Sequence, residues 1–564
     1  MKSENKKLFS NILAAIIIAL LLVFLMDVDQ FVAAYKLYNG KASDFSTSAF
    51  SAKELSNFSI SSTILLYTER YLKTSLLLMI SFIIIVLFKD DQKSYSKYKI
   101  FQDNPDLNKI VLLGRWLLGI ILGGFILNFG RDFFNDTFHN CLVGREQDFY
   151  RVFFSGFVLA LCVVDYKKIY NTIKNIDSLP LYKKLEPHFY KIILVSGIAI
   201  LFTRIIHFKP TPATYSAVSY YMNYTNFGFV RRAFIGEIFY RLFGYYIPLD
   251  SMRLYSTISS AVCGVIIVLL VYFIVRKRIK KDILVLTLFL VFLISPVSSL
   301  FTYLTGRFEI YMLLLAVLSM YFAIRNDITM WLIPVICFIG PLIHTSFAFE
   351  AFPLIFIVLV YRWLINPDKE KYASNAAICI ISTCICVGGF FYLEFFSYKN
   401  AIVNYDEALQ TLIDRALGWE YPLQANLIRE IILSPFNEAI QMESEWTNIT
   451  PQYIVENFIT RIVFYIPLFI GYLYTFYFMA KKIYHSLKSY IILLMPFTLL
   501  VFVALYGIAC DYGRWSTALI YEIILGNIFM IVNEKDFDLK KYKELISIAI
   551  FVFSVVPGVI ALFR

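Results

Sequence analysis

Apolar residues recur along the whole chain in long runs, separated by shorter polar stretches. A helix needs about 20 apolar residues to cross a hydrocarbon core of about 30 Å. The pattern therefore predicts an all-α, polytopic membrane protein with about fifteen transmembrane helices. The runs lie near residues 10–26, 73–88, 110–129, 149–165, 190–207, 253–275, 283–303, 308–324, 329–344, 347–364, 374–396, 457–479, 489–509, 515–532 and 544–562.

Lysine and arginine gather in alternate connections between these runs. Because such residues mark cytoplasmic loops, the N-terminus is expected in the cytoplasm, with the first run as a retained signal anchor. The long connections then face outward: 28–72, 130–148, 208–252 and 397–457. Within the last of them, Tyr405 to Leu433 is amphipathic and predicts helices on the membrane surface. A single membrane domain, 1–564, is the simplest organisation.

Composition agrees with a membrane protein and excludes several other classes. Charged residues make up 16% of the chain, against about 25% in soluble domains. The net charge of +11 lies largely in short loops beside the runs, so no nucleic-acid partner is expected. Most of the eight cysteines lie inside apolar runs and do not predict a disulfide framework. No P-loop, HExxH or CxxC motif is present, which argues against ATP-driven pumping and a dedicated zinc site.

The first run ends in two carboxylates, Asp27 and Asp29, at its expected outer mouth. Such a pair can act as a general base toward a sugar hydroxyl, or hold a divalent cation. Acidic residues are also ordinary where a helix end meets water. The two interpretations stay open.

The stretch from Asn223 to Glu237 is the most unusual segment, because it places adjacent Arg231 and Arg232 in an outward loop. Two guanidinium groups, beside two glycines that allow close backbone approach, predict a clamp for a phosphate or diphosphate. Glu237 is a supporting residue. Arg204, near the outer end of an earlier run, would face the same cavity.

Two further outer turns carry arginine: Gly306-Arg307-Phe308-Glu309 and Asp511-Tyr512-Gly513-Arg514-Trp515. Arg307 and Arg514 would add cations around the same cavity, with Asp511 beside them. Alternatively, an acid and an arginine three residues apart pair with each other and close a turn.

His344 and Glu350 fall in a short outer hairpin between two apolar runs. Polar residues at such depth are costly, which makes this pair a candidate for acid–base chemistry. A hydrogen-bonded structural histidine is the alternative.

The first run, its acidic outer end and the amphipathic stretch that follows resemble the GT-C class of integral membrane glycosyltransferases. That resemblance implies a polyprenyl-linked sugar donor and a catalytic acid at Asp27 or Asp29, and permits a divalent cation. The run number, long outer loops and outer arginines also resemble O-antigen and capsule repeat-unit polymerases. That second likeness implies that Arg231, Arg232 and Arg415 hold the diphosphate, without metal.

The expected function is therefore glycosyl transfer in cell-surface polysaccharide assembly, at the outer face of a bacterial plasma membrane. A repeat-unit polymerase is the first choice, and a GT-C transferase with a polyprenyl-phosphate sugar donor is the second. The third is a flippase or transporter of lipid-linked oligosaccharide, which needs charged or broken-helix sites near mid-membrane. Expected partners are the polyprenyl-linked glycan, membrane lipid and a chain-length regulator or flippase.

Overall fold

The computed structural model describes residues 115–119, 122, 171, 175, 180–206, 219–294, 306–365, 369–415, 434–435, 438, 465–482, 487–502, 512–534 and 542–562. The chain divides into two compact units, 1–183 with 563, and 184–562 with 564. Nearly all of the described residues belong to the second unit, which holds the candidate site.

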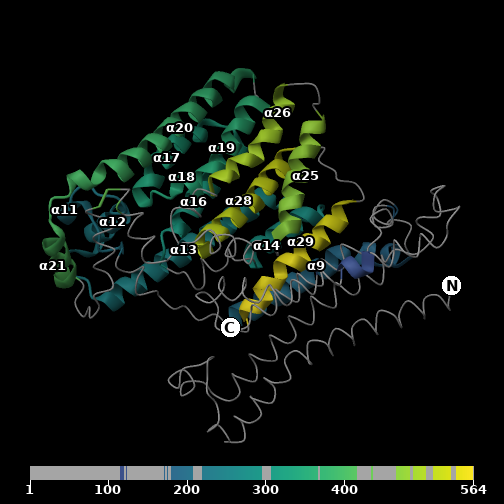
Figure 1. Ribbon diagram of the computed structural model, residues 1–564, viewed down its shortest axis with the longest axis horizontal. Helices are drawn as coiled ribbons and strands as arrows, with labels where there is room; N and C mark the ends of the chain where they lie inside the picture. The colour runs from purple at the N-terminus through teal and green to yellow at the C-terminus, as the bar shows by residue number, and fades with distance from the viewer. Residues whose placement is uncertain are drawn as a thin grey trace, which may run out of the picture. The chain divides into compact units, whose positions relative to one another are not determined.

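The described residues of the second unit are almost all helical (Figure 1). Its α-helices are α9 (Pro180–Ile206), α11 (Tyr224–Phe227), α12 (Phe234–Phe243), α13 (Leu249–Val275), α14 (Ile283–Ile294), α16 (Glu309–Arg325), α17 (Leu332–Ile343), α18 (Phe347–Glu350), α19 (Phe352–Val360), α20 (Tyr372–Phe395), α21 (Tyr405–Arg415), α25 (Ile466–Lys482), α26 (Leu487–Leu494), α28 (Tyr512–Asn533) and α29 (Tyr542–Leu562). Shorter 3₁₀ or π turns are η3 (Ile328–Trp331), η4 (Tyr361–Ile365), η5 (Lys369–Lys371), η6 (Ser397–Asn400) and η10 (Met495–Leu500). The prediction of a helical fold is confirmed for these parts.

Four of the described helices are long and apolar enough to cross a membrane: Tyr182–Phe202, Leu249–Val275, Tyr372–Phe395 and Arg514–Asn533. Shorter apolar helices, Ile283–Ile294, Ile328–Ile343, Phe352–Ile365 and Leu487–Leu500, coincide with other predicted runs. Pro341 inside α17 and the π turn after α19 interrupt two of these runs. The count of about fifteen spans includes runs outside the described residues and stays a prediction.

α28 is the central helix of the bundle. Of its apolar window, 94% is buried, against 39% or less for the other three long helices. It contacts α14, α16, α19 and α25, and α17 runs beside α20 on one side of the bundle (Figure 1). A helix that is apolar on all faces is expected at such a central position.

At one end of the bundle, which we call the Arg362 end, arginine side chains donate hydrogen bonds to backbone carbonyls of neighbouring helices. Arg362 Nε donates to Ala323 O at 2.6 Å. Arg278 donates to Ile531 O and Glu534 O, each at 2.7 Å. The last carbonyls of a helix lack partners within the helix, so these cations satisfy them and oppose the helix dipole. Arg278 and Arg362 come from two of the basic connections predicted to be cytoplasmic, and both lie at this end.

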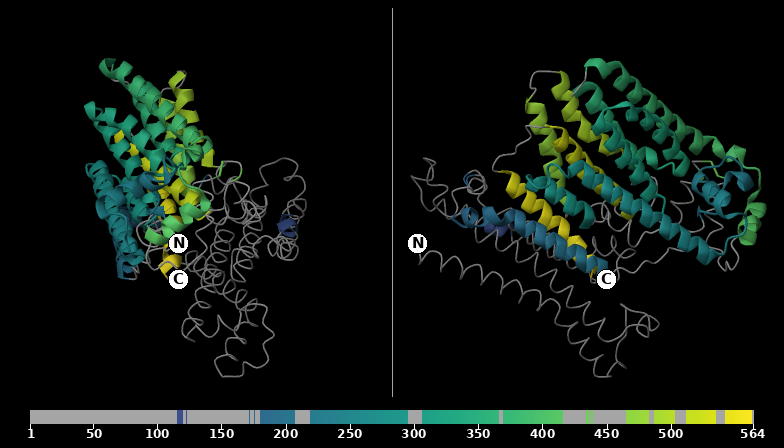
Figure 2. Two further views of the ribbon diagram at one scale, coloured as in Figure 1. Left: turned by 90° about the vertical axis from the view of Figure 1, so that its left-hand side faces the viewer. Right: turned by 180° about the vertical axis from the view of Figure 1, so that it is seen from behind.

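At the other end, α11, α12 and α21 gather beside the end of α20 (Figure 2). α21 begins with a reciprocal cap, in which Asn404 Oδ1 accepts from Glu407 N at 3.0 Å and Asn404 N donates to Glu407 Oε2 at 3.1 Å. An isolated antiparallel bridge joins Gly228 to Ala401. The predicted amphipathic helix after Tyr405 is confirmed as far as Arg415.

Candidate functional site

The segment from Asn223 to Glu237 consists of α11, a short turn and the first residues of α12. Gly228 has a φ of +85°, and a Cβ there would lie 2.1 Å from Asn400 O. A Cβ on Gly236 would lie 1.6 Å from Met222 O. The space beside these two glycines, which was predicted to admit an anion, is taken up by backbone oxygens. The atoms that approach them are the chain's own carbonyl oxygens.

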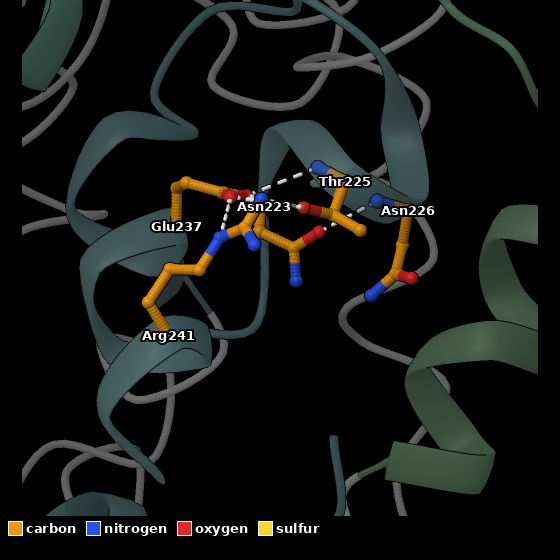
Figure 3. A network of polar contacts seen from close by, with 5 residues as sticks. All are labelled: Asn223, Thr225, Asn226, Glu237 and Arg241. Atoms are coloured by element: carbon orange, nitrogen blue, oxygen red, sulfur yellow. Dashed lines mark hydrogen bonds and ion pairs between the residues drawn. The ribbon is translucent and has the colours of Figure 1, made fainter. Parts of the chain in front are cut away.

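Glu237 fastens this turn together (Figure 3). Its carboxylate accepts from Thr225 N at 3.0 Å and from Arg241 Nε at 2.8 Å. Burial alone would raise the pKa of the Glu237 carboxyl, but the hydrogen bonds from Thr225 and Arg241 outweigh it and lower that pKa. Asn223 Oδ1 caps α11 by accepting from Asn226 N at 2.7 Å. Glu237 therefore supports the loop that carries the two arginines.

We expect Gly236→Ala to destabilise the protein by about 3 kcal/mol, because the methyl group would collide with a backbone oxygen that cannot move freely. The measurement is thermal unfolding of the purified protein. Gly388→Ala in α20 is the matched control, since a Cβ there meets nothing within 4 Å. Equal melting temperatures for the two variants would contradict the close approach.

Arg231 is buried, with 5% of its surface exposed. Its Nη1 forms an ion pair with Glu394 at the end of α20, and its Nη2 donates to Ser434 O at 2.8 Å. A buried ion pair of this kind fixes the position of both partners, because each charge would be costly alone. Arg231 thus joins the turn before α12 to α20.

Arg232 differs from its neighbour in backbone and side chain. Its φ is +60°, in the left-handed region that side chains with a Cβ rarely adopt. Its buried Nε has no hydrogen-bond partner within the described parts of the chain. A strained residue with an unused donor points to a role for the side chain itself.

Arg514, in the first turn of α28, pairs with Glu309 at 2.7 Å between Nη1 and Oε1. Glu309 begins α16, and Arg307 lies two residues before it. The buried Nε of Arg307 also lacks a hydrogen-bond partner among the residues that the structure describes. The two predicted arginine turns therefore meet, with the acid of one paired to the arginine of the other.

His344 follows the last residue of α17 and is 7% exposed. Burial, then repulsion from Arg232, Arg514 and Arg231, holds the pKa of its imidazole well below the ordinary value. His344 is thus neutral at pH 7 and lies within electrostatic range of all three arginines. We call this group, with Arg307, Glu309 and Glu394, the arginine cluster.

The hydrogen bond at Nδ1 decides which nitrogen of His344 carries the proton. The backbone N–H of Ser346 donates to Nδ1 at 3.1 Å, and Ser346 Oγ lies 2.6 Å from the same nitrogen. A nitrogen that accepts from an amide has no proton of its own, so the neutral ring carries its proton on Nε2. His344 is therefore a hydrogen-bond donor through Nε2, which does not suit the role of general base.

Glu350 ends α18 and is 1% exposed. Its backbone carbonyl accepts from the hydroxyl of Tyr521 on α28. This contact brings the predicted hairpin against α28, seven residues beyond Arg514.

No known protein family, curated protein or solved structure matches the chain.

Four of the predicted residues are not among those whose side chains the structure describes. Asp27, Asp29 and Asp511 fall outside the described residues, and for Arg204 only the helical backbone is described. Within the described parts, no group of three or more His, Cys, Asp or Glu residues could hold a metal ion.

Arg415 is the last residue of α21 and holds this helix against its neighbours. It is fully buried, and its guanidinium donates to the backbone carbonyls of Tyr221 and Tyr245. Its Cζ lies 5.3–5.7 Å from the ring centroids of Tyr221, Tyr240 and Tyr245. Cation–π contacts and carbonyl bonds enclose the charge, so Arg415 fastens α21 onto the α12 region. Its Nη2 has no hydrogen-bond partner among the described residues, and the phosphate-binding role of Arg415 stays a prediction.

Sequence reasoning missed three buried glutamates as site residues: Glu309 and Glu394 in the ion pairs, and Glu522 inside α28. The sequence contained a signal for two of them, because Glu394 and Glu522 lie within predicted spans. A carboxylate there is costly and marks a candidate functional residue.

Proposed function

We propose that the chain is a membrane glycosyltransferase-type enzyme that acts on polyprenyl-phosphate- or diphosphate-linked sugars, most simply as a repeat-unit polymerase. The observation that supports it is the convergence of Arg231, Arg232 and Arg514 around neutral His344. Glu394 and Glu309 neutralise Arg231 and Arg514, so Arg232 keeps its charge, and Arg307 adds a further cation. An excess of guanidinium groups at one end of an apolar bundle suits a substrate with an anionic headgroup and a lipid tail in the membrane.

In this proposal the arginine cluster lies at the extracytoplasmic face of a bacterial plasma membrane, with the N-terminus in the cytoplasm. Arg232 and Arg307 bind the phosphate oxygens, and His344 donates a hydrogen bond from Nε2 to a phosphate or sugar oxygen. The base that accepts the proton of the attacking hydroxyl is then a carboxylate. Asp27, Asp29 and Glu350 are the candidates, and the GT-C form of the proposal places this role on Asp27 or Asp29.

We expect Arg307→Gln to weaken binding of polyprenyl diphosphate by about tenfold to a hundredfold, because one charged hydrogen bond contributes about 1.5–3 kcal/mol. The measurement is binding of polyprenyl diphosphate to the purified protein in lipid nanodiscs, with uncharged polyprenol as the comparison ligand. Arg325→Gln is the matched control, since Arg325 lies at the opposite end of α16 and its side chain is 50% exposed. Equal binding of polyprenol and its diphosphate, or equal effects of the two substitutions, would contradict the anion site.

A transporter of lipid-linked oligosaccharide is the second candidate function. Glu522, buried within a candidate span, and the interrupted run from α17 to α19 favour it, because such features accompany transport sites. Incubation of proteoliposomes with a lipid-diphosphate oligosaccharide separates the two. A longer glycan supports the polymerase, and movement of the unchanged substrate between leaflets supports the transporter.

A further inference from the structure

Glu522 and Tyr472 are polar side chains in the apolar interior of the bundle, where α19, α25 and α28 meet. Each is 1% exposed. Neither oxygen of the Glu522 carboxyl, nor the Tyr472 hydroxyl, has a hydrogen-bond partner within the described residues. Buried polar groups nearly always have partners, so these two require a physical explanation.

The two groups face each other across the contact between α25 and α28. A Cβ on Gly526 would lie 3.1 Å from Cε2 and 3.6 Å from the hydroxyl of Tyr472. Gly526 follows Glu522 by four residues, so both lie on the same face of α28. Glu522 is eight residues from Arg514, which corresponds to about 12 Å along the helix. The carboxyl is therefore well inside the bundle and separate from the arginine cluster.

The groups that face Glu522 do not include a cation within the described parts. They are Glu350 of α18, the Leu354 amide of α19, Tyr472 of α25 and the adjacent Tyr521. An ionised carboxylate without a cation or a set of donors is very costly in such surroundings. The second buried carboxyl, Glu350, adds to that cost, because two nearby carboxyls cannot easily both ionise.

The amide of Leu354 lies near the Glu522 carboxyl and is the one feature that favours the charged form, although it makes no hydrogen bond of ordinary geometry to it. It belongs to the first turn of α19, where amides lack partners within the helix. One neutral donor contributes about 1 kcal/mol, whereas burying an unpaired carboxylate costs several times that amount. A simple capping role for an ionised Glu522 is therefore the weaker interpretation.

We propose that Glu522 is a proton-binding carboxyl inside the bundle, protonated at neutral pH, with Tyr472 as its neighbour on α25. The neutral acid binds one proton and releases it as the carboxylate forms. The Glu350 carboxyl lies within electrostatic range of Glu522, so a charge on one disfavours a charge on the other. This proton-binding site is separate from the arginine cluster. The proposal for it does not depend on the proposed function.

Dicyclohexylcarbodiimide tests this assignment, because it reacts with protonated carboxyls in apolar surroundings and leaves ionised ones unmodified. The full-length protein in nanodiscs is treated at pH values from about 6 to 10, and the labelled peptides are identified by mass spectrometry. We expect Glu522 to be modified at neutral pH and the modification to fall at alkaline pH, where the carboxyl ionises. The ion-paired Glu309 and Glu394 are internal controls and should remain unmodified.

Glu522→Gln completes the experiment. Glutamine is a neutral isostere of the protonated acid, so this variant should keep the wild-type melting temperature and lose the label. An unmodified Glu522 in the folded wild-type protein, or a large drop in melting temperature for Glu522→Gln, would overturn the proposal in favour of an ionised cap on α19. Protection of Glu522 by sodium or potassium at constant pH would overturn it in favour of a cation site. Neither readout involves glycosyl transfer, so failure here and failure of the proposed function are distinguishable.

Discussion

Glu394→Ala is expected to destabilise the protein by about 3–5 kcal/mol, because it leaves the buried guanidinium of Arg231 without its charged partner. The carbonyl of Ser434 would remain as an acceptor, but a neutral acceptor does not neutralise the charge. The measurement is thermal or denaturant unfolding of the purified protein. The turn before α12 should lose protection from proteolysis first, since this pair joins it to α20.

Two controls separate the buried pair from a general effect of lost charge. Arg253→Ala breaks the pair with Asp250, whose side chain is 90% exposed, and should cost at most about 1 kcal/mol. The double replacement of Arg231 by Met and Glu394 by Leu removes both charges and should cost less than Glu394→Ala alone. Equal losses in Glu394→Ala and Arg253→Ala would show that the Arg231 pair contributes no more than a surface contact.

Arg232→Gly is expected to lower glycosyl transfer by about a hundredfold or more, as loss of a donor to transition-state charge does. It should at the same time leave stability unchanged or raise it by up to about 1 kcal/mol. A left-handed backbone costs a residue with a Cβ about 1–2 kcal/mol, and glycine removes that strain at an entropic cost of about 0.5–1 kcal/mol. The φ of +60° is the reason for expecting activity and stability to change in opposite directions.

Arg232→Lys is the matched variant, because it keeps the charge and the strained backbone but loses the planar fork. It should have wild-type stability and reduced turnover. Transfer is measured as elongation of a lipid-diphosphate oligosaccharide, and stability as the melting temperature of the same preparation. A destabilised Arg232→Gly that retains turnover would make Arg232 a structural residue and remove the main support for the anion site.

The predicted acid–base role of His344 shows the limit of residue type as a guide. The sequence places a histidine between two apolar runs, and the structure places it near three arginines. The amide of Ser346, two residues away, then fixes the proton on Nε2. That hydrogen bond depends on the turn after α17, which the residue types alone do not specify.

Arg415 and Arg514 show the same limit for charge. Both follow or adjoin acids in the sequence, and both were expected to bind phosphate. Arg415 is enclosed by three tyrosines, whereas Arg514 pairs with Glu309 from a distant helix. The contacts of each arginine depend on which residues from distant parts of the chain bury its guanidinium. No local sequence pattern contains that information.

The sequence by itself determined the helical class and the positions of the apolar helices in the described parts, and it marked Gly228 and Gly236 as positions without a Cβ. These features follow from local rules, since apolar runs form helices in lipid and glycine permits contacts that a Cβ forbids. Only the tertiary structure decided that Arg231 pairs with Glu394, that Arg514 pairs with Glu309 and that Glu522 is buried near Tyr472. Such pairs join residues far apart in the chain, and their energies depend on burial and on the packing of helices against one another.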